Sequence, residues 1–277
     1  MWFFLALISA VLYAWMWLLA RMSRGIASST TTAAVTAWGV PLFLWMLTQV
    51  TYPWSEIWWR LYLVLPLAVI PWTMYLLTYA SQRAPVTVVK PLAAISTLST
   101  LVVSAIFFRN IFLPAHVMGI FVVTTGLFYL YRGNWQAWRE PWPWYTLLGV
   151  LVLGVNVAAI KEVLLRFPHP FAVLALAATG TFVWNAAFSC MQRNRTRITV
   201  PMMRLLLIFA LVTIVQDFTT FMAIAAGPAP HVIAVKRTSI LFAAVFSYTF
   251  LHERQQSLWK LLLASGIVVM GVVMLVS

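Results

Sequence analysis

The chain has few charged residues, and acidic residues are especially rare. Of its 277 residues, 5 are Asp or Glu, 18 are Lys or Arg, and charged residues make up only 8%. Soluble domains typically contain about 25% charged residues, so the composition excludes an ordinary soluble domain. Because 63% of the residues are hydrophobic, we expect the lipid bilayer to surround most of the chain.

Cysteine, clustered histidine and catalytic motifs are also scarce. The single cysteine, Cys190, excludes an intrachain disulfide. The 4 histidines share no metal-binding spacing, so we expect no metal site. Paired carboxylates, a nucleophile beside an ordered base, and a phosphate-binding glycine loop are missing too. We therefore expect no enzyme, no catalytic residues, no cofactor and no direct use of ATP.

Apolar runs long enough to cross a bilayer follow one another along the chain. About 20 residues of helix span a hydrocarbon core about 30 Å thick, and only helices and closed barrels satisfy their backbone in lipid. The sequence thus predicts an all-α membrane protein with ten transmembrane helices. We place these spans at about 2–20, 33–50, 60–80, 86–107, 111–131, 143–163, 169–191, 201–226, 231–250 and 257–276. The N-terminal run lacks a basic start and a cleavage site, so we interpret it as the first span.

The longest polar connection, 132–144, divides the chain into two parts with five expected spans each, 1–131 and 132–277. An odd number of spans per part places the second part upside down relative to the first, as in the inverted repeats of many transporters. Internal matches support a duplication. The turn Gln82-Arg83-Ala84-Pro85, followed by Lys90, matches Gly227-Pro228-Ala229-Pro230, followed by Lys236.

The net charge of +13 has a topological explanation. Most Lys and Arg residues lie in the odd-numbered loops, and the even-numbered loops hold only Arg60, Arg109, Lys161 and Arg166. By the positive-inside rule, the odd loops are cytoplasmic and both chain ends face outward. We therefore expect a multi-pass protein of the inner or plasma membrane, with the bilayer and not nucleic acid as its partner.

Three bases and one acid lie inside apolar runs: Lys90, Lys236, Arg237 and Asp217. A charge at the centre of a span costs about 3 kcal/mol, so such residues line cavities, form pairs or extend to the interface. Either both lysines extend to the membrane surface, or they converge on a central cavity and bind an anionic group. Asp217 either neutralises Lys236 or Arg237 or couples transport to protons.

Other polar and aromatic residues lie within the expected spans. Asn156 and Asn185 are suited to contacts between helices or to substrate binding. Trp72 and Trp184 either pack or line a cavity. Lys161-Glu162 with Arg166 is typical of an i,i+4 ion pair at a helix end.

The end of the chain resembles the EamA-type drug/metabolite transporter superfamily. The resemblance is carried by Phe250-Leu251-His252-Glu253-Arg254, by the last span with Gly266 and Gly271, and by the small residues and Pro turn of 223–253. It implies ten helices that move small organic solutes by alternating access, with the substrate held between the halves. Arg109-Asn110 departs from the acidic residue usual in the family, and the family's cytoplasmic termini are opposite to those derived from the loop charges.

We therefore expect a secondary-active or exchange transporter of a small organic metabolite, either an anion or an amphipathic molecule with an anionic part. A coupling ion is compatible with this, as is a monomer or a homodimer. The expected substrate-binding residues are Lys90, Lys236, Arg237, Asp217, Asn156, Asn185, Trp72 and Trp184. The alternatives are a lipid flippase or lipid-phosphate carrier with a lateral cleft, and a non-transporting membrane scaffold subunit with paired, occluded bases.

Overall fold

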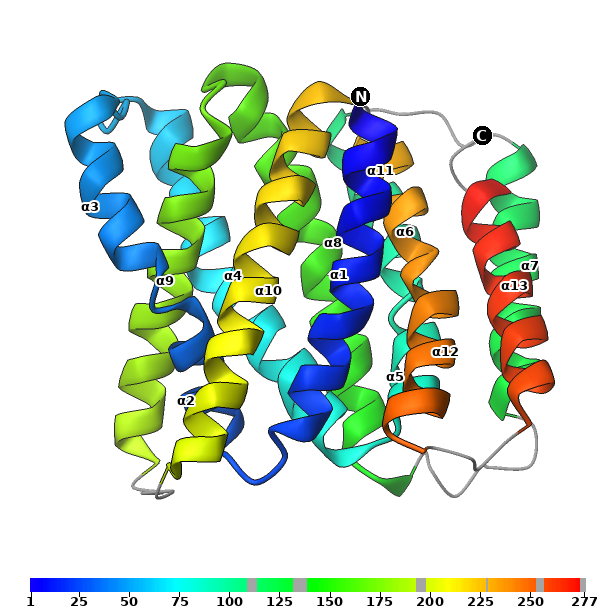
Figure 1. Cartoon of the computed structure of the whole chain (residues 1–277). Helices are drawn as coiled ribbons and strands as arrows, with labels where there is room; N and C mark the ends of the chain where they lie inside the picture. Colours follow the sequence, from blue (N-terminus) through cyan, green and yellow to red (C-terminus); the bar gives the residue numbers. More distant parts are fainter. Residues whose placement is uncertain (109–113, 132–138, 193–197, 228, 253–256, 275–277) are drawn as a thin grey trace.

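The computed structural model describes residues 1–108, 114–131, 139–192, 198–227, 229–252 and 257–274. Within these ranges the chain is built of α-helices and contains no strand. The helices stand side by side along one common direction, and α1 begins at the same end of the bundle at which α13 ends (Figure 1). Their bounds are α1 Trp2–Met22, α2 Ser28–Thr36, α3 Gly39–Gln49, α4 Ile57–Arg83, α5 Val86–Leu92, α6 Ile95–Phe108, α7 Pro114–Tyr131, α8 Trp142–Arg166, α9 Pro170–Met191, α10 Val200–Ala226, α11 Ala229–Arg237, α12 Ser239–Phe250 and α13 Leu258–Met274.

The prediction of an all-α, multi-pass membrane protein agrees with these helices. Among the residues described, six helical stretches are long and apolar enough to cross a membrane. They are Trp2–Met22, Ser28–Gln49, Trp142–Arg166, Pro170–Met191, Val200–Ala226 and His231–Phe250. The full count of ten spans stays a prediction.

Three of the expected spans are interrupted and consist of two helices each: 33–50 (α2 and α3), 86–107 (α5 and α6) and 231–250 (α11 and α12). Pro41 lies four residues after Ala37, the residue that follows the end of α2, and a proline ring clashes with the carbonyl four residues before it. At the end of α11 the hydroxyl of Thr238 donates to the carbonyl of Val235 at 2.7 Å. Such a local bond competes with the regular helix.

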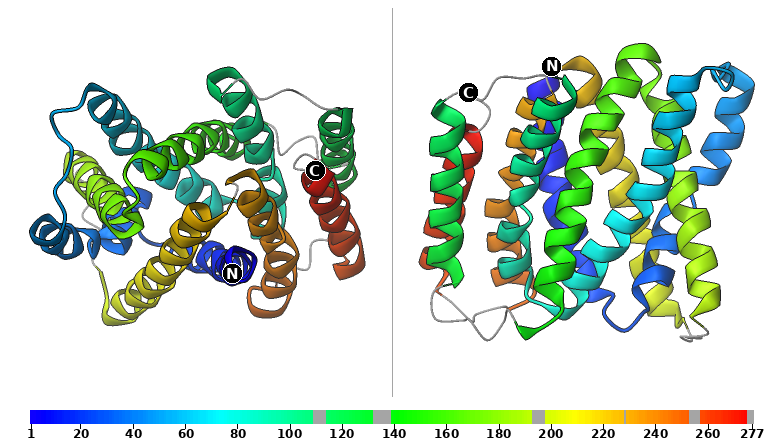
Figure 2. Two further views of the ribbon diagram at one scale, coloured as in Figure 1. Left: turned by 90° about the horizontal axis from the view of Figure 1, so that it is seen from above. Right: turned by 180° about the vertical axis from the view of Figure 1, so that it is seen from behind.

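The helices pack as neighbours in an order that differs from their order in the chain. α4 packs on α8, α1 on α10, α2 and α3 on α9, and α7 on α13. Seen from above, α7 and α13 form a pair at one side of the bundle, while α3 and α9 lie toward the other side (Figure 2). Between these two sides lie α1, α4, α8, α10 and α11, which carry most of the polar residues described below.

At each end of the bundle, a basic side chain donates hydrogen bonds to main-chain carbonyls of a distant segment. Near the end of α8, the ammonium group of Lys161 donates to the carbonyls of Ile224 at 2.9 Å and Gly227 at 3.1 Å. Near the end of α1, the guanidinium of Arg21 donates to the carbonyl of Gln82 at 2.6 Å. The last carbonyls of a helix lack partners within it, so each base satisfies acceptors that would otherwise be orphaned.

The structure bears on several local predictions. Glu162 and Arg166 form the expected i,i+4 ion pair at 2.7 Å, whereas Lys161 contacts α10. Glu253-Arg254, which carries part of the family resemblance, and Arg109-Asn110, which departs from it, lie outside the described residues. Of the polar connection 132–144, the structure describes residues from 139 onward.

Gly154 allows α8 to approach α6 closely. A methyl group at this position would meet the side chain of Ser99 and the backbone nitrogen of Thr100. Ser99 donates across the same contact to the carbonyl of Leu151 at 2.9 Å. The backbones of α6 and α8 therefore approach so closely that a side chain at position 154 would not fit without a shift.

We predict that Gly154→Ala lowers the stability of the purified protein by about 1–3 kcal/mol, the usual cost of overpacking. The matched control is Gly266→Ala, because nothing lies within 4 Å of a methyl group at that position, and alanine favours the helix. Thermal unfolding in detergent measures both variants. Equal melting temperatures would contradict the close approach.

Candidate functional site

A cavity lies in the middle of the bundle, between helices from both parts of the chain. The side chains that line it come from α1, α2 and α4 of the first part and from α8, α9, α10 and α11 of the second. The space free of atoms among them, its mouth included, is about 1130 Å³. Because this volume includes open space at the mouth, the enclosed part of the cavity is smaller.

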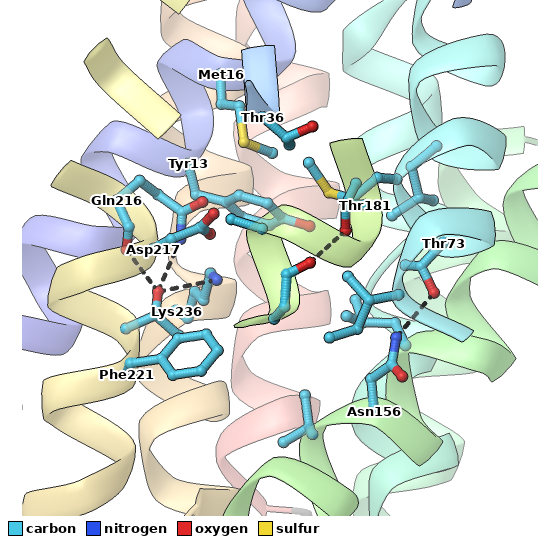
Figure 3. A pocket seen from close by; sticks show the side chains of 18 of the residues that line it. Tyr13, Met16, Thr36, Thr73, Asn156, Thr181, Gln216, Asp217, Phe221 and Lys236 are labelled. Atoms are coloured by element: carbon cyan, nitrogen blue, oxygen red, sulfur yellow. Dashed lines mark hydrogen bonds between the residues drawn. The ribbon is translucent and has the colours of Figure 1, made fainter. Parts of the chain in front are cut away.

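One side of the cavity is charged, and Gln216 of α10 is at its centre. When the Gln216 amide is oriented so that both its atoms find partners, its oxygen accepts from the Lys236 ammonium at 2.9 Å and its nitrogen donates to the Asp217 carboxylate at 3.1 Å. Such amide orientations are assigned from the hydrogen bonds around them. Lys236 also donates to the hydroxyl of Thr220 at 3.1 Å. Figure 3 shows Gln216, Asp217 and Lys236 together at one side of the cavity.

Gln216 changes the expected role of Asp217. Direct pairing with Lys236 or Arg237 was one of the two predictions, but within the described ranges the salt bridges include none at Asp217. The acid and Lys236 are instead linked through the neutral amide of Gln216. Both charged groups therefore keep part of their hydrogen-bonding capacity for the cavity that they line.

Tyr13 of α1 brings the two lysines together. The Lys90 ammonium lies 3.2 Å from the centre of the Tyr13 ring, and the Lys236 ammonium lies 4.4 Å from the same point. Lys90 also lies 4.7 Å from the centre of a Trp17 ring. Such cation–π contacts contribute about 2 kcal/mol or more when water is excluded. The two ammonium groups thus lie near the same aromatic ring.

Lys90 does not extend to the membrane surface. Its side chain is 1% exposed, and in the part of the chain that the structure describes its ammonium has no hydrogen-bond partner. It is also not among the residues that line the cavity, since the aromatic ring of Tyr13 lies against it.

Arg237 is buried beside the same ring. It is 2% exposed, lines the cavity and donates to the hydroxyl of Ser96 on α6, while the Tyr13 hydroxyl lies within reach of its guanidinium. Both Lys236 and Arg237 thus lie beside Tyr13, but Lys236 also contacts α10 and Arg237 contacts α6, in line with their separation of about 100° around the helix. Together with Lys90, three bases therefore lie around Tyr13. The cavity lining beside them contains one carboxylate, that of Asp217.

The remaining predicted site residues divide into two groups. Asn156 lines the cavity, and its amide nitrogen donates to the Thr73 hydroxyl at 3.1 Å. Asn185 is buried and donates to the carbonyl of Thr181 at 3.0 Å, and it does not line the cavity.

Trp72 and Trp184 do not line the cavity either. Their rings contact each other at 6.0 Å. With exposed fractions of 38% and 45%, both lie at the outside of the bundle. The packing alternative therefore describes them, and they join α4 to α9.

Sequence reasoning missed the polar residues that organise the charges: Tyr13, Gln216, Thr220 and Ser9. Ser9 and Thr220 share a hydrogen bond at 2.6 Å, although 211 residues separate them. Only Gln216 gave a signal, as the neighbour of Asp217 in an apolar run. Among the residues described, no group of three His, Cys, Asp or Glu is able to hold a metal ion.

Comparison with known proteins gives a fold but no family. No family model matches the sequence, and no curated protein matches it. One solved structure, described only as a crystal structure of a protein, shares the fold with a TM-score of 0.70. The similarity covers 98% of this chain and 95% of that chain, at 16% sequence identity. At this identity the likeness concerns the fold alone.

We predict that Gln216→Leu lowers the stability by about 1–3 kcal/mol, because it leaves Asp217 and Lys236 without the amide that links them. The matched control is Thr213→Val, one turn earlier on α10. The Thr213 hydroxyl is buried and has no partner among the described residues, so its removal leaves the melting temperature unchanged or raises it. If both variants melt alike, Gln216 does not have this role.

Proposed function

We propose that the chain is a secondary-active or exchange transporter of a small organic metabolite that is anionic, or amphipathic with an anionic part. It works by alternating access, with the substrate site between two inverted halves, 1–131 and 132–277, of five spans each. The observation that carries the proposal is a central cavity with more bases than acids, lined by helices of both halves.

The charges favour an anion as the substrate. Lys236, Arg237 and Asp217 line the cavity, and Lys90 lies behind Tyr13. Burying an unmatched positive charge costs several kcal/mol. An anionic group bound beside Lys236 and Arg237 lowers that cost, so these charges favour such a ligand.

Two equivalent contacts support the duplication. The sequence match aligns Gln82 with Gly227, and each of these residues accepts a hydrogen bond from a base near the end of the first helix of its half. Arg21 of α1 donates to Gln82, and Lys161 of α8 donates to Gly227. α1 begins at one end of the bundle and α8 begins at the other (Figure 1), as inverted halves require.

The helix breaks follow the same pattern. In the fourth expected span, the first helix, α5, ends two residues after Lys90. In the ninth expected span, the first helix, α11, ends at Arg237. Interrupted helices at matching places in two halves are typical of substrate sites in transporters with inverted repeats. The resemblance to EamA-type transporters is part of this proposal, and a gradient or an exchanged solute supplies the energy.

The alternative functions differ in what they require. A scaffold subunit with occluded, paired bases does not need the cavity that Lys236 and Arg237 line. A lipid flippase needs an opening toward the bilayer, and a lipid-scrambling measurement on the same proteoliposomes tests it directly.

We predict that wild-type protein in proteoliposomes moves charge when organic acids are applied, as recorded by solid-supported-membrane electrophysiology. The acids are a panel of aryl and alkyl sulfonates and carboxylates, and quaternary ammonium salts of similar size serve as the opposite charge. Lys236→Gln is expected to weaken the response to the acids about 10–100-fold, because it removes a charge-assisted contact.

The matched control is Arg204→Gln, which removes an exposed base from α10 and should leave the response unchanged. A response to the cations alone would contradict the proposal, as would wild-type currents from the acids that Lys236→Gln does not change. Scrambling of fluorescent lipid without any response to the acids would favour the flippase.

A further inference from the structure

The side of the cavity opposite to the charges contains an unsatisfied acceptor. Asn156 of α8 is 2% exposed and lines the cavity. Its amide nitrogen donates to Thr73, but its amide oxygen is buried and has no hydrogen-bond partner among the residues described. Buried polar atoms are nearly always paired, so an unpaired one in a cavity wall calls for an explanation.

This acceptor and the bases are well separated. Figure 3 shows Asn156 and Thr73 at one side of the cavity and Lys236, Gln216 and Asp217 at the other. Much of the remaining lining of the cavity is apolar and includes Met74, Leu77, Leu153, Val157 and Phe221. A ligand that touches both ends is therefore elongated, with a hydrophobic middle.

We propose that the cavity binds an elongated organic acid that carries a hydroxyl or N–H group on its far end. The acid group binds beside Lys236 and Arg237, the apolar body lies along α4, α8 and α10, and the far hydroxyl or N–H donates to the Asn156 amide oxygen. The acid end rests on the proposed function, whereas the donor end rests on Asn156 alone.

The buried acceptor at one end of the cavity makes binding selective for ligands that carry a hydrogen-bond donor. An apolar pocket discriminates weakly between similar ligands, but a site with a buried polar group discriminates strongly against a ligand that leaves that group unpaired. The Asn156 oxygen thus acts as a specificity determinant, separate from the charges that attract any organic anion.

The test uses two series of probes, ω-phenylalkanoates from propanoate to hexanoate and their 4-hydroxyphenyl counterparts. Calorimetry measures binding to the full-length wild-type chain in detergent. At the chain length that spans the cavity, the hydroxyl should tighten binding about 10-fold. The 4-methoxyphenyl acid, which has no donor, should lose that gain, and this comparison needs no variant. Equal affinity for the hydroxyl and methoxy acids at every length overturns the proposal, as does the absence of binding by every acid.

Variants then assign the preference to a residue. Asn156→Leu should bind the plain phenyl acid within about 3-fold of the wild type and show no preference for the hydroxyl. The control, Thr181→Val, changes a cavity hydroxyl that already donates to the Ala177 carbonyl at 2.8 Å, and it should keep the preference. A preference retained in folded Asn156→Leu overturns the proposal.

The methyl esters of the same probes separate the two claims. If acids and esters bind equally, the anionic substrate of the proposed function is wrong, while the hydroxyl preference is still measured on the esters. If acids bind more tightly than esters but the hydroxyl has no effect, the proposed function stands and the donor end is wrong.

Discussion

Positive charge inside an apolar bundle is the constraint on which the rest of the structure depends. Each base has its own partners. Lys90 lies against the rings of Tyr13 and Trp17, Lys236 donates to Thr220 and to the Gln216 amide, and Arg237 donates to Ser96. Most of the partners named here are neutral, and one carboxylate, that of Asp217, lines the cavity together with Lys236 and Arg237. The contacts also tie α1, α5, α6, α10 and α11 to one centre.

The interrupted helices help to hold these bases. Lys90 lies in the last turn of α5, and Lys236 and Arg237 lie in the last turn of α11. The carbonyl end of a helix carries partial negative charge, which favours a cation by about 0.3–2 kcal/mol depending on burial. A continuous span would have carried this end to the membrane surface. Breaking the helix inside the bundle places it beside the bases.

The sequence predicted the helical architecture and the main charged residues, because both depend on strong, local signals. Apolar runs of about 20 residues identify membrane helices, and a lysine such as Lys90 inside one is conspicuous. The organising role of Tyr13 was not predictable, because its contacts with α5 and α11 depend on how distant segments pack. For the same reason Trp72 and Trp184 were expected at a cavity and lie at the outside, since the spacing of aromatic residues does not indicate which face of a helix points inward.

The contacts made by Arg21 and Lys161 bear on the duplication proposed above, because they place no demand on the side chain of the acceptor residue. In both contacts the acceptor is a main-chain carbonyl, which every amino acid supplies. A substitution at Gln82 or Gly227 would therefore leave the acceptor in place. If the proposed halves share an origin, a comparison of their side chains alone would miss this common feature of their backbones.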